Sequence, residues 1–173
     1  SAAAGTLDAT TIASMQGDIR LNAVTGMTLG AIDAGTGNVS ANVSGHANPA
    51  LRVNDHVAAG GNVDLASDTG TLMMAAGSHV DAGESATLVS GSDMVLGTVS
   101  ANAASGNAIS ITSGGGILGN GAAINLHARN GGDTSLQSVG DIGTSMQPLV
   151  VDTQSLSGRS SDGNVWLRTL GDI

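Results

Sequence analysis

The sequence predicts an all-β protein, a right-handed parallel β-helix of about seven coils with three short strands in each coil. The first observation is a repeat of the form Gly-[Asp/Asn]-apolar-x-apolar along the chain. Its copies begin at Gly17, Gly37, Gly61 and Gly163, with looser copies at Gly83, Gly106 and Gly132. The second is strict alternation of apolar and polar residues between Gly, Asn, Asp and Ser turns, which is typical of short strands. Since such strands are not stable alone, equivalent strands of successive units must stack.

Each unit contains three predicted strands. The first follows the repeat start, as at residues 19–21, 39–41 and 63–65. A second glycine then opens another alternation, such as residues 27–29 or 71–74. The third has the form Ile32-Asp33-Ala34-Gly35 or Val80-Asp81-Ala82-Gly83, and we assign Leu7-Asp8-Ala9 to the same slot of an N-terminal unit.

Composition fits a narrow coil. The 173 residues include 27 Gly but no Phe, Tyr or Cys, and Trp166 is the only aromatic residue. Ala, Val, Ile, Leu and Met fill the predicted interior, where rings would crowd. Corners are expected to need positive φ, which Gly and Asn adopt cheaply. No amphipathic helix is predicted.

Charge and hydropathy exclude several functions. With no Lys, five Arg and a formal charge of −9, the chain has no basic face for nucleic acid. No apolar run is long enough to span a membrane. Without Cys there is no disulfide framework and no thiol nucleophile.

No cofactor or metal site is predicted. The four histidines, His46, His56, His79 and His127, lack metal-ligand spacing. The Gly-Gly-x-Gly-x-Asp calcium repeat is not completed at 60–62 or 131–133. We interpret residues 114–116 as a corner, because no Lys-Ser/Thr and no helix follow them.

The carboxylates favour turn and surface roles. Asp18 and Asp141 follow corner glycines, where Asp and Asn cap their own backbone. Asp33 and Asp81 share one slot of different coils. Glycoside hydrolysis needs two carboxylates at a fixed separation. No cluster stands out in the sequence, so we predict a non-catalytic protein, with a polysaccharide-degrading or glycan-binding module as the alternative.

Two stretches break the rhythm, between residues 43 and 59 and between residues 140 and 163, where a polar loop is predicted from Gln154 to Asp162. Both are interpreted as coils with longer corners, and corners are where solenoids carry function. Alternation points Trp166 outward. The candidate ligand contacts taken from these stretches and their surroundings are His46, Asn48, Arg52, His56, Arg159 and Trp166. Two sequons, Asn38-Val39-Ser40 and Asn42-Val43-Ser44, matter only in a cell with the glycosylating enzyme.

The ends suggest a piece of a longer protein. The chain starts at Ser1 without a signal peptide and stops at Gly171-Asp172-Ile173, a tripeptide that resembles the start of a repeat unit. We therefore expect residues 1–173 to be a single β-helix segment of a larger chain. Open coil ends would then favour end-to-end self-association.

Gly-Asn-Val-x-Leu units such as residues 61–65, with Met-x-Leu-Gly-x-Ile-x-Ala segments such as residues 27–34, resemble the repeats of filamentous haemagglutinin-like adhesins. The most specific part is Asp141-Ile142-Gly143-Thr144, then Pro148-Leu149-Val150-Val151-Asp152, then Gly163-Asn164-Val165-Trp166-Leu167. These adhesins are large virulence exoproteins of bacterial two-partner secretion. The resemblance implies a right-handed β-helical shaft, secreted to the cell surface through an outer-membrane partner, with adhesion to a host-cell receptor or glycan. It implies no catalytic residues.

Overall fold

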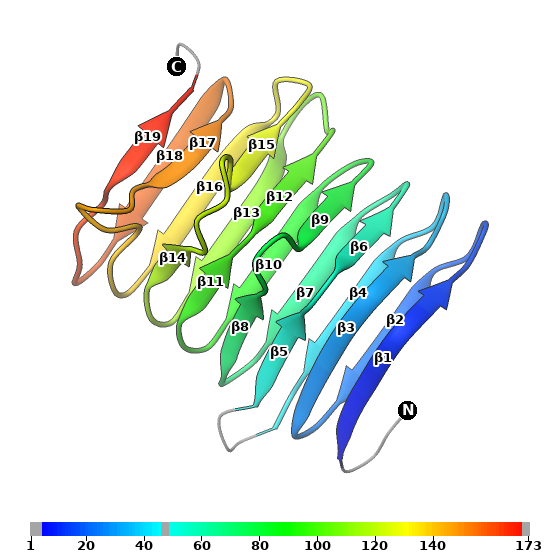
Figure 1. The fold of residues 1–173 in the computed structure, drawn as a ribbon. Helices are drawn as coiled ribbons and strands as arrows, with labels where there is room; N and C mark the ends of the chain where they lie inside the picture. The colour runs from blue at the N-terminus through cyan, green and yellow to red at the C-terminus, as the bar shows by residue number, and fades with distance from the viewer. Residues whose placement is uncertain (1–4, 46–48, 171–173) are drawn as a thin grey trace.

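A computed structural model describes residues 5–45 and 49–170, which form nineteen strands and no helix. Every strand pairing is parallel, and the strands wind into a β-solenoid of about seven turns. In Figure 1 the near strands run toward the upper right, while the coils advance from the N-terminus at the lower right to the C-terminus at the upper left. This is a right-handed winding, so the predicted fold class is confirmed.

The coil has three faces. Face 1 is a separate seven-stranded sheet: β2 (Ile19–Ala23), β4 (Val39–Val43), β7 (Val63–Ser67), β10 (Ala86–Ser90), β13 (Asn107–Ser113), β16 (Asp133–Ser138) and β18 (Ser155–Ser160). Face 2 contains β5 (Ala50–Val53), β8 (Thr71–Met74), β11 (Met94–Leu96) and β14 (Ile117–Gly119). Face 3 contains β6 (His56–Ala59), β9 (His79–Ala82), β12 (Thr98–Ala101), β15 (Leu126–Ala128), β17 (Leu149–Asp152) and β19 (Leu167–Thr169).

Two long strands join faces 2 and 3 at the N-terminal end. β1 (Thr6–Ala13) and β3 (Gly26–Asp33) have eight residues each, longer than the short strands that the sequence predicts. The first half of β3 pairs with β5 and its second half with β6. The corner between faces 2 and 3 is therefore absent from the first coils and appears only where the chain leaves β5.

The interior is filled from all three faces, as predicted. In-register pairing puts the same inward position of each strand above its equivalent in the coil below. Because the rows repeat at strand spacing, about 4.8 Å, neighbouring aliphatic side chains stack along the axis. The largest fully buried side chains are Met27, Leu29, Ile32, Leu51, Leu65, Leu72, Leu88, Met94, Leu96, Ile109, Ile111 and Ile117.

One inward row is polar, which the sequence analysis did not anticipate. Ser67, Ser90, Ser113 and Ser138 occupy the last inward position of face 1 and are buried. Their hydroxyls donate to corner carbonyls, including Ser90 to Ser92 O at 2.8 Å and Ser138 to Gly140 O at 2.6 Å. The row satisfies carbonyl groups that the turn from face 1 to face 2 directs inward.

Most corner glycines are required for space and not for positive φ, which corrects the expected reason. Glycines with positive φ are Gly5, Gly35, Gly77, Gly106, Gly121, Gly131 and Gly143. The glycines that open the corner to face 2, Gly45, Gly70, Gly91 and Gly114, lie against a backbone carbonyl of the preceding coil. A Cβ atom there would overlap that carbonyl, because adjacent corners stack directly on each other.

Three assignments from the sequence were wrong in detail. The polar segment predicted as a loop from Gln154 is strand β18, in register with β16. The last repeat copy, at Gly163, does not begin face 1, because Val165 bridges to Ile142 on face 2. Leu7–Ala9 was assigned to the third strand of its unit, which corresponds to face 3. It instead pairs with Met27–Leu29 on face 2. The last two errors arose because an apolar alternation looks the same on any face, and the first because β18 is mostly polar and exposed.

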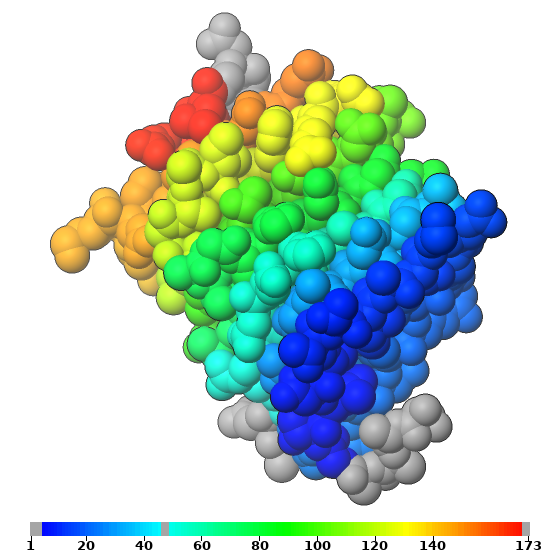
Figure 2. All heavy atoms as spheres, turned by 45° about the vertical axis from the view of Figure 1, so that its right-hand side comes forward, coloured from blue at the N-terminus to red at the C-terminus, as the bar shows by residue number. Residues whose placement is uncertain are grey.

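The first irregular stretch forms an ordinary coil through β5 and β6, with residues 46–48 outside the described part. Figure 2 shows the coils as bands of colour packed closely against each other, with no deep hollow on the face in view. A ligand on the face in view would therefore meet only shallow surface features.

Candidate functional site

The four candidate ligand contacts that the structure describes do not gather in one place. His46 and Asn48 lie outside the described residues. Arg52 lies on β5 of face 2, and His56 begins β6 on face 3. Arg159 lies on β18 of face 1, five coils further along. The sequence-based set is therefore spread over three faces.

Arg52 and His56 flank the turn from face 2 to face 3. Arg52 is exposed, and its Nη1 lies 3.7 Å from Met73 Sδ on the next coil. The His56 ring stacks on His79 with centroids 5.4 Å apart and an interplanar angle of 13°. His56 Nδ1 also lies 3.4 Å from Asp55 Oδ1. Stacking thus brings together two histidines that are far apart in sequence.

Arg159 and Trp166 belong to the last coil. Arg159 lines a groove of about 380 Å³ with Gln137 and Val139. Trp166 is half-buried, and its backbone bonds to Ile142 and Leu149 of the preceding coil. Its partial burial leaves less ring surface for a sugar than the outward orientation suggested.

Face 3 gathers chemistry-bearing side chains that the sequence did not connect. Its outward row runs through Asp33, Ala58, Asp81, Ser100, His127 and Asp152 in register. The shared slot of Asp33 and Asp81 was predicted and is confirmed, with Ala58 between them. Ser100, His127 and Asp152 were missed, because their register depends on corner lengths that differ from coil to coil.

A shallow groove, the face-3 groove, lies along this row. It has a volume of about 270 Å³, and its lining includes Asp33, Asp81, Asn102 and Arg129. Arg129 follows β15 and reaches back two coils, with Nη2 3.1 Å from Asp81 Oδ1. Both side chains of this ion pair are more than two-fifths exposed, so its contribution to stability is small. The groove offers two carboxylates and one guanidinium to a polar ligand.

The carboxylate spacing limits what the groove can do chemically. Asp33 and Asp81 are two coils apart, about 9.6 Å at ordinary strand spacing. Retaining glycosidases need carboxyl groups about 5 Å apart, and inverting ones need about 6.5–9.5 Å. The pair therefore does not suit a retaining mechanism and lies at the far limit of an inverting one.

A Ser-His-Asp order also occurs on this row. His127 Nε2 lies 3.4 Å from Asp152 Oδ2, and Ser100 is the in-register neighbour on the other side. A carboxylate that orients an imidazole beside a hydroxyl is the arrangement of nucleophilic catalysis. Ser100 is only 5% exposed, however, so a substrate would not reach its hydroxyl. We therefore assign no nucleophile here.

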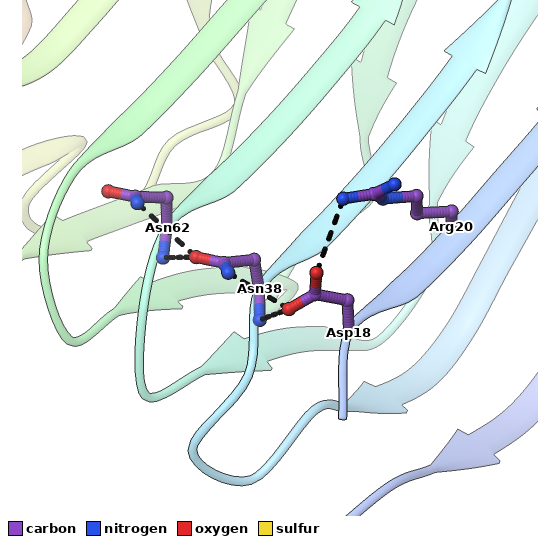
Figure 3. Close-up of polar contacts among 4 residues, drawn as sticks. All are labelled: Asp18, Arg20, Asn38 and Asn62. Carbon is purple, nitrogen blue, oxygen red and sulfur yellow. Dashed lines mark hydrogen bonds and ion pairs between the residues drawn. The ribbon is translucent and has the colours of Figure 1, made fainter. Parts of the chain in front are cut away.

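The corner from face 3 to face 1 carries a second polar arrangement, the corner amide ladder of Asp18, Asn38, Asn62 and Ser85. Asp18 Oδ1 accepts from Asn38 N and Nδ2 at 3.0 and 2.9 Å. Asn38 Oδ1 accepts in turn from Asn62 N and Nδ2 at 2.8 and 3.2 Å (Figure 3). Asn62 Oδ1 accepts from Ser85 N and Oγ. Each of these side chains thus bonds to a neighbouring coil. The expectation that Asp18 caps its own backbone is therefore wrong.

Asp18 is the charged end of this ladder. The backbone N–H of Asn38 lowers the pKa of Asp18 below its ordinary value, and the Asn38 side-chain amide and Arg20 act in the same direction. Arg20 Nη2 lies 3.3 Å from Asp18 Oδ2. Hydrogen bonds to a carboxylate favour its ionised form. The ionised carboxylate therefore fits the ladder better than the protonated one does.

We predict a pH-dependent difference between the wild type and Asp18→Asn. Because the pKa is lower in the folded state, the ionised carboxylate stabilises the fold above the unfolded pKa, ~3.9, and this stabilisation is lost as pH falls through the folded value. Urea unfolding should be measured from neutral to strongly acidic pH. The wild type should have a higher midpoint than the variant at neutral pH and the same midpoint in acid. Curves that stay parallel across this range would contradict the assignment.

The corner amide ladder also includes Asn38, the asparagine of the first sequon. Asn38 uses its side-chain oxygen and nitrogen in the ladder, so attaching a glycan would break bonds to two coils. Asn42 points outward from β4 beside Asn22 and is half-buried. Its Oδ1 is buried without a hydrogen-bond partner in the described structure. Neither asparagine stands on an exposed loop in the folded chain.

In the ranges 5–45 and 49–170, no three His, Asp or Glu side chains lie close enough together to hold a metal ion. Nothing in the same part of the chain is a helix with the length and hydrophobicity that a membrane crossing requires.

Comparison with protein-family models, with curated proteins and with solved structures gives no match to this chain. The resemblance to haemagglutinin-like repeats therefore rests on its motifs alone.

Proposed function

We propose that this chain is a structural and adhesive segment, a non-catalytic β-helical shaft of a large secreted bacterial surface protein. In this proposal the parent protein resembles the filamentous haemagglutinin-like adhesins and leaves the cell by two-partner secretion through an outer-membrane partner. The segment gives mechanical reach and offers a strand face, face 3, to a host-cell receptor or glycan, as expected for a virulence factor.

The observation that supports this proposal is the continuous stack of parallel coils, in register except for one shift between β13 and β16 at Asn107. Face 1 alone aligns seven strands, each paired with its neighbour over several residues. Solenoids of this kind present extended surfaces and gain stability repeat by repeat. The grooves on the described surface are shallow and include charged side chains, such as Asp33 and Arg129 in one and Asp18 and Arg20 in another, which suits attachment through many weak contacts.

Binding of the purified protein to host-type cells and to immobilised glycans tests the proposal. We expect saturable binding without release of cleaved glycan. The double variant Asp33→Ala with His56→Ala on face 3 should bind about tenfold more weakly, because polar contacts to the ligand are lost. The matched control, Thr87→Ala with Ser110→Ala, changes outward residues of face 1 and should bind as the wild type does.

Failure to bind any cell type or glycan would reject the adhesive role and leave a spacer. Glycan cleavage would instead favour the alternative, a polysaccharide-degrading module. The observation that keeps this alternative is the pair Asp33 and Asp81 within one groove. Cleavage lost in both Asp33→Asn and Asp81→Asn would assign that activity to the face-3 groove.

We also expect end-to-end self-association. β1 pairs only with β3, and β18 and β19 end their sheets within the described structure. Such edges are templates for further strands. Val165→Lys places a charge on the last coil and should shift sedimentation toward the monomer. Val139→Lys, equally exposed at 43% but within the stack, is the control and should leave association unchanged. Concentration-independent monomers in the wild type would refute this expectation.

A further inference from the structure

The chain contains two Asn-Gly pairs, Asn120-Gly121 and Asn130-Gly131. The two asparagine side chains differ in their hydrogen bonds and in their exposure. An asparagine before glycine can deamidate without an enzyme. The backbone nitrogen of the glycine attacks the side-chain amide carbon of the asparagine, and glycine has no side chain to hinder this attack. The reaction needs a side chain free to rotate and a backbone free to follow. Sequence alone gives both pairs the same reactivity.

We propose that Asn130 is a site of spontaneous deamidation in the folded protein and that Asn120 is protected from it. The proposal is independent of the adhesive function. It concerns the covalent state of the turn between β15 and β16, beside the face-3 groove.

Asn120 is held by three hydrogen bonds. Its Nδ2 donates to Ala75 O at 2.7 Å and to Met74 O at 3.3 Å, two coils back along the chain. Its Oδ1 accepts from Ala122 N at 3.2 Å. The side chain is also half-buried. Cyclisation would have to break these bonds before the side-chain amide carbon of Asn120, Cγ, could approach the Gly121 nitrogen.

Asn130 is exposed and lies in the turn after β15. In the described structure its side chain makes one hydrogen bond, from Nδ2 to Asn102 O at 3.3 Å, at the long end of the range. Gly131 (φ +87°) and Gly121 (φ +90°) both lie outside the strands, so the two sites differ in the hydrogen bonds and the exposure of the asparagine side chain. The reactive rotation is therefore far less restricted here.

The reaction is balanced without a co-reactant other than water. The Gly131 nitrogen bonds to Asn130 Cγ, the bond from Cγ to Nδ2 breaks, and ammonia leaves. Water then opens the cyclic imide at either carbonyl and yields aspartate or isoaspartate. Either product adds one negative charge next to Arg129, the partner of Asp81 in the face-3 groove. Isoaspartate also lengthens the main chain of this turn.

Peptide mapping by mass spectrometry of the folded protein during incubation at mildly alkaline pH tests the proposal. Cleavage after arginine places the two sites in separate peptides, residues 53–129 and 130–159. We expect deamidation at Asn130 to be at least about tenfold faster than at Asn120, on the order of the hydrogen bonds that Asn120 must break. In urea the two rates should become equal, because the difference comes from the fold.

Asn130→Ser removes the reactive amide and should abolish the acidic species on ion exchange, with the circular dichroism spectrum unchanged. Equal rates in the folded state, or faster reaction at Asn120, would overturn the proposal. So would a rate difference that persists in urea, since it would then belong to the local sequence and not to the structure.

Discussion

Replacing Asn125 with alanine is expected to lower the free energy of unfolding by about 3 kcal/mol. Asn125 is 2% exposed and joins three coils through its side chain. Its Nδ2 donates to Leu96 O and Gly97 O, both at 3.2 Å, and its Oδ1 accepts from Val150 N at 3.1 Å. Leu96 O keeps a second donor, the backbone nitrogen of Asn120. The variant therefore leaves Gly97 O and Val150 N unpaired in a buried corner.

Urea unfolding followed by far-ultraviolet circular dichroism measures this loss as a lower midpoint. Asn107→Ala is the matched control, because Asn107 is exposed at the start of β13 and its change should shift the midpoint little. Equal midpoints for the two variants would mean that Asn125 does not hold the coils together. An altered slope would indicate partial unfolding of the last coils, since solenoids lose repeats in parts.

Replacing Gly114 with alanine is expected to destabilise the fold by about 2–3 kcal/mol, although Gly114 is exposed. Replacing glycine with alanine at an unstrained position normally stabilises the folded protein by about 0.4–1 kcal/mol, because it lowers the conformational entropy of the unfolded chain. Here the new Cβ would overlap the Gly91 carbonyl, with Gly91 C only 2.8 Å away. Because Gly114 N also donates to Ser90 O at 2.9 Å, the coil would separate locally to admit the methyl group.

Gly158→Ala provides the control. Gly158 lies on β18, and an added Cβ would meet only Leu167 Cδ1 at 3.6 Å, an ordinary contact. This variant should be neutral or slightly stabilising in the same urea experiment. If both variants behave alike, the close stacking of corners is not what requires glycine at position 114.

The candidate site was harder to predict than the fold. The slot shared by Asp33 and Asp81 followed from the repeat, and the structure confirms it. The pairing of His127 with Asp152, and of Arg129 with Asp81, did not follow, because an insertion of one residue in any corner changes which side chains become neighbours. The role of Asn125 was likewise hidden, since it looks like any other turn asparagine.

The sequence by itself determined the class of fold. Alternating apolar residues between regularly recurring glycines specify short strands that are stable only when stacked, and this requirement leads to a β-helix before any coordinate is known. The tertiary structure decided which face each strand occupies, which corner glycines lack room for a Cβ, and which polar side chains meet across coils. The physical reason is that these features depend on register between coils, which is set by corner geometry and by contacts far apart in the chain.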